Sequence, residues 1–379
     1  MRLTSNNKKL LQSFHSYQNL IASEFRDSLP KITQNFIRDT GCLRFFLDTS
    51  ATFTAISICL RRPVLALIHL QLILNVNNFQ YGNSPAEFLD IHHVSIKDQL
   101  IADSGPVLVF VHGGAWGSGK PWMYRNIAYN LAASINASSV VIVGYPTYPC
   151  AGIPDQVKSV TNAIHFIKNS TSLLQTDDIH MKRKLILAGH SSGAHIGALA
   201  LALSSPVDGV NPTLHSEETG IHDSHKHLVD GFIGIAGVYD IHKHYSWEAG
   251  RGLHEISPMK GSVESADKLV DYSPTIILRN RRTDTQEIPR DRRQHVFPPS
   301  LLIHGAGDVV VPSSSSEEFH DTLRDICPDI QTCIVDCDHL YPILHFLDDN
   351  DKTGADGEMV ESIDAFCKRL YSNENTNNK

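Results

Sequence analysis

The chain has 379 residues, 41% of them hydrophobic, and a formal net charge of −8. That length and apolar content suffice for a large buried core, in one domain or two. The mild negative charge argues against a nucleic-acid partner. The seven cysteines are scattered and form no Cys-x-x-Cys pair, which favours free thiols in a reducing compartment.

We predict that residues 1–95 form a helical extension that precedes the main domain. Its polar start predicts no secretory signal. Ala51–Leu60 and Pro63–Val76 are apolar, but each is too short to span a bilayer. Arg61, Arg62 and Pro63 would interrupt a single span through both segments. Two alternatives stay open for residues 51–76, contact with a membrane surface or packing of a helical hairpin on the main domain.

From residue 96 to 371, apolar runs alternate with helical patterns. This alternation predicts one α/β domain, with a mostly parallel central sheet flanked by helices. The predicted strands are 107–111, 139–145, 184–188, 231–236, 298–305 and 332–335, and the predicted helices are 154–168, 194–203, 314–326 and 358–371.

Four segments fall outside that alternation. Residues 240–297 lie between two predicted strands, and we expect them to form a cap over a pocket. Within them, the arginine-rich stretch Leu278–His295 predicts a solvated insertion. Asn211–Lys226 predicts a surface loop, and the polar residues 372–379 predict a disordered tail.

A glycine-rich loop follows the predicted strand 107–111. It reads His112-Gly113-Gly114-Ala115-Trp116. Glycines let backbone N–H groups turn toward a bound oxygen without a Cβ in the way. Loops of this His-Gly-Gly type supply oxyanion-hole amides in esterases and lipases. We therefore assign Gly113, Gly114 and Ala115 to an oxyanion hole, with the N–H of Gly114 or Ala115 as a donor.

A second motif, Gly189-His190-Ser191-Ser192-Gly193, lies between the predicted strand 184–188 and the predicted helix 194–203. A sharp strand-to-helix turn of the form Gly-x-Ser-x-Gly is a nucleophile elbow, which exposes its central serine at the top of a sheet. The following helix directs its positive end at the site. The pattern predicts Ser191 as a nucleophile and the Ser192 N–H as the second oxyanion donor.

An acid and a base follow in the chain order that this motif requires, serine, then aspartate, then histidine. Asp308 comes just after the predicted strand 298–305, and His339 follows the predicted strand 332–335. We predict His339 as the general base and Asp308 as its orienting partner. His345 is the rival base. Asp336 and Asp338 are alternative acids that we expect to be turn or capping residues instead.

Together the motifs resemble the α/β-hydrolase superfamily and, within it, the isoprenylcysteine methylesterase-like branch of carboxylesterases. The resemblance runs from about Val107 to Pro342 and is carried by Phe110–Trp116, Gly189–Ile196, Gly234–Asp240 and Pro298–Asp308. It implies an α/β-hydrolase fold with a cap, and a serine esterase. The implied substrate is a small lipophilic ester such as a prenylated cysteine methyl ester.

Two other functions stay open. Kynurenine formamidase-like arylformamidases share the His-Gly-Gly-x-Trp loop and the run Gly-His-Ser-x-Gly-Ala-His. A hydrolase-fold binding protein without catalysis is the third alternative, although such a protein would be expected to lack one of Ser191, Asp308 and His339. The chemistry implies no metal and no organic cofactor. The expected location is cytoplasmic, at the cytosolic face of an endomembrane if residues 51–76 contact it.

Overall fold

The computed structural model describes residues 77–96, 99–100, 105–170, 183–205, 227–284, 296–327, 329–347 and 355–372. The predicted helices within 51–76, the loop at 211–226, residues 285–295 and the tail from 373 on lie outside the described residues. In the part of the chain that is described, no helix is long and apolar enough to cross a membrane.

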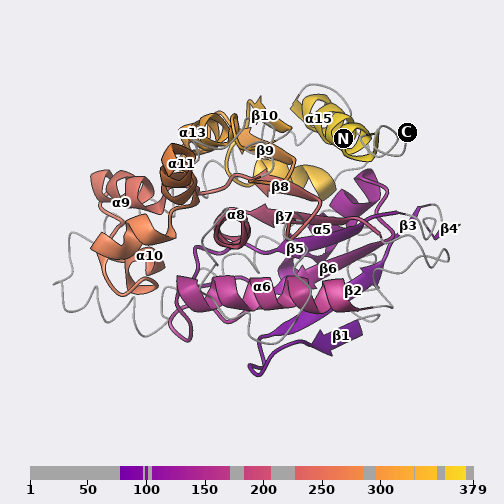
Figure 1. The fold of residues 1–379 in the computed structure, drawn as a ribbon, viewed down its shortest axis with the longest axis horizontal. Coiled ribbons are helices and arrows are strands. Elements are labelled where there is room, and N and C mark those ends of the chain that lie inside the picture. The colour runs from indigo at the N-terminus through magenta and orange to yellow at the C-terminus, as the bar shows by residue number, and fades with distance from the viewer. Residues whose placement is uncertain are drawn as a thin grey trace, which may run out of the picture.

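An eight-stranded sheet forms the centre of the molecule, with the strand order β1-β2-β6-β5-β7-β8-β9-β10 (Figure 1). The first two strands pair antiparallel, and the six from β5 to β10 run parallel. The strands are β1 Asn77–Gln80, β2 Phe88–His93, β5 Val107–Val111, β6 Ser139–Val143, β7 Leu185–His190, β8 Gly231–Ile235, β9 Ser300–Gly305 and β10 Ile330–Val335; β3 Ser95–Ile96 and β4 Gln99–Leu100 form a separate hairpin.

The parallel strands read as continuous apolar runs because helices cover both faces of the sheet. In β5, Val107, Val109 and Val111 belong to one core cluster, while Leu108 and Phe110 belong to the other. This alternation follows from the two-residue period of a strand. The first cluster includes side chains of α6 Ile153–Asn169, α8 Ser192–Ser204 and α13 Ser314–Leu323, and the second includes those of α5 Pro121–Ser134 and α15 Ala355–Ser372.

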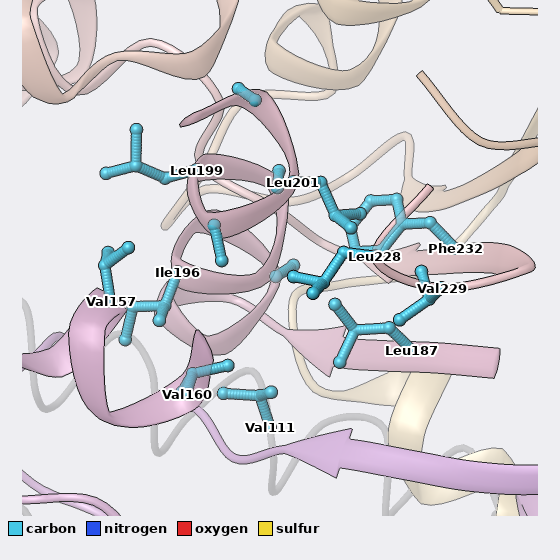
Figure 2. Packing of buried hydrophobic residues seen from close by; sticks show 14 of the residues in the cluster. Val111, Val157, Val160, Leu187, Ile196, Leu199, Leu201, Leu228, Val229 and Phe232 are labelled. Atoms are coloured by element: carbon cyan, nitrogen blue, oxygen red, sulfur yellow. The ribbon is translucent and has the colours of Figure 1, made fainter. Parts of the chain in front are cut away.

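The helix α8 that follows the predicted nucleophile is buried on nearly all sides. Figure 2 shows Ile196 of α8 beside Val157 and Val160 of α6, and Leu201 beside Phe232 of β8. A helix that is apolar all round must be enclosed by other elements. This enclosure fixes α8, and therefore the position of Ser191 at its start.

Between β8 and β9 the chain forms α9 Ile241–Gly250, α10 Pro258–Gly261, the 3-10 helix η1 Ala266–Tyr272 and α11 Pro274–Asp284, grouped at one end of the sheet (Figure 1). Of the solvated insertion predicted at 278–295, the described part 278–284 continues α11, in which Arg279 and Asn280 are exposed as predicted but Leu278 is not. Leu278 is fully buried, and the Arg281 guanidinium donates to the carbonyl oxygen of Ala202 near the end of α8. That arginine completes a helix C-terminus, where carbonyls lack partners.

The predicted helical extension 1–95 is also wrong at its end, because residues 77–93 contribute β1 and β2 to the sheet. In β2 the side chains of Asp90 and His92 are buried, so the strand lacks the apolar pattern by which buried strands are predicted. Asp90 pairs with Arg125 on α5 at 2.6 Å, which supplies the buried carboxylate with a partner.

Candidate active site

Ser191, His339 and Asp308 meet at the carboxyl edge of the parallel strands. Ser191 follows β7, Asp308 follows β9 and His339 follows β10. The Ser191 Oγ lies 3.0 Å from His339 Nε2, and His339 Nδ1 lies 2.6 Å from Asp308 Oδ2. With Nδ1–H donating to the carboxylate, Nε2 is left unprotonated and accepts the hydroxyl proton of Ser191. The predicted nucleophile, base and acid are thus joined by two consecutive hydrogen bonds.

The Asp308 carboxylate is held on both oxygens. Its Oδ1 accepts the backbone N–H groups of Val310 at 2.8 Å and Val311 at 2.9 Å. His304 Nε2 lies 3.2 Å from Oδ2, beside the bond to His339. Burial opposes ionisation of Asp308, but His339 and the hydrogen bonds from both histidines outweigh it and keep the pKa of Asp308 well below its usual range. The acid is therefore ionised and fixed in orientation.

The alternative residues lie elsewhere. Asp336 is exposed, and Asp338 Oδ1 accepts the N–H groups of Leu340 at 3.0 Å and Tyr341 at 2.9 Å, as a turn residue does. His345 lies on the 3-10 helix η3 His345–Leu347, with its ring beside that of Phe346. The contact with Ser191 is made by His339.

The nucleophile elbow, Gly189–Gly193, has the backbone strain expected of a sharp turn. Ser191 has φ 53° and ψ −122°, which a residue with a side chain rarely adopts. The turn also requires the absence of a Cβ at Gly193, since that atom would collide with the carbonyl oxygens of Val111 and His112 at the end of β5. The start of α8 consequently packs directly against the loop after β5.

Replacing Gly193 should therefore disrupt the site. In a Gly193→Ala variant either the helix start or the end of β5 must shift, because both neighbours are backbone atoms. Overpacking of this kind costs about 1–3 kcal/mol of stability, and we expect a lower thermal midpoint together with at least a tenfold loss of ester hydrolysis, since about 1.4 kcal/mol of barrier is tenfold in rate. Gly250→Ala is the matched control, because nothing lies within 4 Å of a Cβ there. Equal midpoints and rates in the two variants would refute this account of the turn.

The oxyanion loop, His112–Trp116, turns through three consecutive residues with positive φ. The angles are 135° at Gly114, 50° at Ala115 and 60° at Trp116. Ser118 stabilises the turn, with its N–H and its hydroxyl donating to the Gly114 carbonyl at 2.8 and 2.9 Å. The Tyr145 hydroxyl donates to the His112 carbonyl at 2.7 Å, and the two rings stack at 4.3 Å. The loop is a defined structure rather than a loose connection.

The predicted oxyanion residues have different surroundings. Gly113 lies against the elbow, where a Cβ would meet the His190 carbonyl oxygen at 2.7 Å, and its backbone hydrogen-bonds the Tyr124 hydroxyl. Among the described residues, no hydrogen bond occupies the backbone N–H of Gly114, Ala115 or Ser192. These three amides remain available to an oxygen of a bound molecule. Gly113 contributes by allowing the close approach of loop and elbow.

Three buried histidines, one each in the oxyanion loop, the elbow and α8, stay neutral. Burial lowers the pKa of His112 to about 4, and burial together with the nearby His339 lowers that of His190 to about 3. Burial also lowers the pKa of His195 to about 4. The His190 ring lies 5.0 Å from that of His339, so a charge on His190 would oppose a charge on the base. The oxyanion loop and the elbow are therefore lined by uncharged imidazole rings.

The same histidines predict how stability depends on pH. An unfolded histidine has a pKa of about 6.5, so in acid the unfolded chain binds protons that the folded chain excludes. The stability they contribute is complete above about pH 6.5 and is lost as pH falls toward 4, by up to about 1.4 kcal/mol per pH unit for each histidine. Urea unfolding at pH 7.5 and pH 5.0 measures the difference. An unchanged free energy of unfolding would contradict the burial of neutral rings.

Several supporting residues were not predicted from the sequence. They are Tyr124, Tyr145, Ser118, Gln156 and His304, all of which hydrogen-bond the loop, the elbow or the acid. The signal for Gln156 is its place on the apolar face of the predicted helix 154–168, where a buried amide needs partners. Tyr124 and Tyr145 gave no such signal, because their partners lie 66 and 33 residues away in the sequence.

The described cysteines agree with the prediction of free thiols. Cys150, Cys327, Cys333, Cys337 and Cys367 are unpaired, whereas Cys42 and Cys59 lie outside the described residues. Burial raises the pKa of Cys367 to about 12. Such a thiol stays protonated and is a poor nucleophile.

The sheet topology with a serine at the turn after β7 defines an α/β-hydrolase fold, and solved structures confirm it. The chain resembles esterase B of Lactobacillus rhamnosis, with a TM-score of 0.55 and 13% identity over 86% of this chain and 99% of that one. It also resembles the Pyrobaculum calidifontis esterase, with a TM-score of 0.52 and 15% identity over 91% of this chain and 98% of that one.

The chain belongs to the BD-FAE family, whose model matches residues 89–323. It is 28% identical over 249 residues to the isoprenylcysteine alpha-carbonyl methylesterase of Arabidopsis thaliana, covering 64% of this chain and 51% of that protein. It is 25% identical over 269 residues to esterase LipC of Mycobacterium tuberculosis, covering 69% of this chain and 58% of that protein. The chain thus spans about half the length of the curated relatives it matches.

Proposed function

We propose that this chain is a serine carboxylesterase with Ser191, His339 and Asp308 as its catalytic triad. The observation that carries the proposal is the pair of hydrogen bonds through which His339 joins Ser191 to Asp308, at 3.0 and 2.6 Å. It is supported by the free amides of Gly114, Ala115 and Ser192 beside the elbow. The names of the relatives, several of which are esterases, support the same reaction class.

The reaction proceeds in two stages on this geometry. His339 Nε2 takes the Ser191 proton as Oγ bonds to the ester carbonyl carbon, and the carbonyl π electrons move to its oxygen. The backbone N–H of Ser192 and that of Gly114 or Ala115 stabilise this oxyanion. His339 then protonates the departing alcohol, leaving an acyl-serine. Water, deprotonated by His339, attacks that acyl group and restores Ser191.

We further propose that the substrates of this chain are methyl esters of prenylated cysteine. The support for this proposal is the resemblance of Gly234–Asp240 and Pro298–Asp308 to methylesterases, together with the name of the Arabidopsis relative. We expect a higher kcat/KM for N-acetyl-S-farnesylcysteine methyl ester than for the same ester with an S-methyl group, because burial of each CH₂ group is worth about 0.8 kcal/mol. N-formylkynurenine is the third substrate in this comparison. Turnover of the formamide without turnover of either ester would assign the chain to arylformamidases instead.

Membrane contact through residues 51–76 is part of the same proposal. A prenylated substrate partitions into membranes, so an enzyme held at the surface meets it at a higher local concentration. Leu65→Asp with Leu72→Asp in the full-length protein should reduce vesicle binding and turnover of vesicle-held farnesyl ester. Turnover of a soluble p-nitrophenyl ester should stay unchanged. Loss of the soluble activity as well would favour packing of this segment on the hydrolase domain.

A further inference from the structure

The oxyanion loop is strained where it matters for the proposed function. Ala115 and Trp116 carry side chains yet have φ values of 50° and 60°. Each such residue costs about 1–3 kcal/mol and persists because the surrounding structure holds it in place. The groups that hold Ala115 and Trp116 therefore determine where the Gly114 and Ala115 amides point.

Trp116 is anchored at both its backbone and its side chain. Its carbonyl accepts the Gln156 amide at 2.8 Å and the Tyr148 N–H at 2.9 Å. Its indole Nε1–H donates to His195 Nδ1 at 3.0 Å, with the two rings nearly perpendicular at 85°. Both rings are buried, so water does not replace this bond. His195 is thereby the partner that fixes the indole.

The opposite edge of His195 fixes its tautomer. Its Nε2 lies 2.8 Å from the Tyr272 carbonyl at the end of η1, and a carbonyl can only accept. The Nε2 atom must carry the proton, which leaves Nδ1 free to accept from the indole. A ring protonated on both nitrogens would present a donor to a donor, and burial disfavours that form by lowering the pKa of His195 to about 4.

His195 also shares a helical turn with the nucleophile. Its backbone N–H donates to the Ser191 carbonyl at 3.1 Å in the first turn of α8. The residue that anchors the oxyanion loop is thus one turn from the atom that attacks the ester. This link from Ser191 to the loop consists of one buried side chain and one hydrogen bond.

We propose that His195 is a positioning residue for the oxyanion hole. By accepting a hydrogen bond from the Trp116 indole, it sets the position of the Gly114 and Ala115 amides relative to Ser191. Through the Tyr272 carbonyl it also ties the same turn of α8 to the helical segment between β8 and β9. This inference rests on the proposed serine esterase function and deepens it.

A matched pair of substitutions separates the two bonds of His195. Oδ1 of asparagine occupies the place of Nδ1, so His195→Asn keeps an acceptor for Trp116 and loses the bond to Tyr272. The amide of glutamine reaches the place of Nε2, so His195→Gln keeps the bond to Tyr272 and loses Trp116. Trp116→Phe removes the same bond from the other side.

The measured quantities are kcat and KM for a soluble p-nitrophenyl ester, the inhibition constant of an aryl trifluoromethyl ketone, and the thermal midpoint. The ketone forms an oxyanion on the serine and so reports the same amides. We expect His195→Gln and Trp116→Phe to lower kcat on the order of 10²-fold, the cost of a small misplacement, with KM little changed. The inhibition constant should rise by the same factor in these two variants. The His195→Asn variant should keep most of the wild-type kcat and most of the affinity for the ketone.

The control is His92→Asn, another buried histidine, whose ring pairs with Asp90 on β2. It should lower the thermal midpoint without changing inhibitor affinity. Wild-type activity that depends on Ser191, combined with equal kinetics for the asparagine and glutamine variants, would overturn this inference alone. Absence of Ser191-dependent activity in the wild-type protein would overturn the proposed function and this inference with it.

Discussion

Replacing Ser191 by alanine should abolish ester hydrolysis and leave the fold intact. The Ser191 Oγ makes the 3.0 Å hydrogen bond to His339 Nε2, and its loss removes the attacking atom rather than a packing contact. Removal of a triad nucleophile costs on the order of 10⁴–10⁶-fold in kcat. Initial rates on a p-nitrophenyl ester measure the loss, and circular dichroism with a thermal melt measures the fold.

Ser204→Ala serves as its control, because Ser204 lies at the far end of the same helix, α8. That variant should keep wild-type turnover. A Ser191→Ala protein with a tenth of the wild-type rate would show that another group performs the attack, and the assignment of the triad would fall.

An Asp308→Asn substitution is expected to lower kcat about 10⁴-fold, as in triads where the acid becomes an amide. Asparagine can keep the two backbone bonds that Oδ1 accepts from Val310 and Val311. Its NH₂ group would then face His339 Nδ1 and favour the tautomer with Nε2–H. A histidine in that tautomer presents a proton to Ser191 and cannot accept one.

The matched control for this substitution is Asp338→Asn, in the loop that carries His339. Asp338 Oδ1 accepts the N–H groups of Leu340 and Tyr341, and an asparagine oxygen can accept both. We expect kcat within about twofold of wild type. Comparable losses at Asp308 and Asp338 would mean that the loop geometry, rather than the identity of the acid, limits the reaction.

The strands that carry the site could be predicted from the sequence because they are buried on both faces. Val107–Val111 and Leu185–Ala188 are uniformly apolar, and a Gly-rich turn follows each. The order of Ser191, Asp308 and His339 along the chain then placed each at a strand end. In β7 the strand runs two residues further than predicted, to His190, because the elbow begins within it.

The remaining elements could not be predicted because they depend on contacts between residues that are far apart in the sequence. The strand β2 contains a buried Asp90, whose partner Arg125 lies 35 residues away on α5. The start of the arginine-rich stretch continues α11, where Leu278 is buried and Arg281 reaches the Ala202 carbonyl. Likewise, the hydrogen bond between Trp116 and His195 joins residues 79 positions apart. Periodicity and propensity do not encode such pairings.

Covalent labelling of the nucleophile is the sharpest test of the Ser191–His339–Asp308 triad. The wild-type protein is treated with a fluorophosphonate, which bonds covalently to an activated serine, and the modified peptide is identified by mass spectrometry. We expect one adduct per chain, on Ser191, and in Asp308→Asn we expect labelling to fall in step with kcat. An adduct on another serine, or no adduct in a protein that hydrolyses esters, would contradict the assignment of this triad.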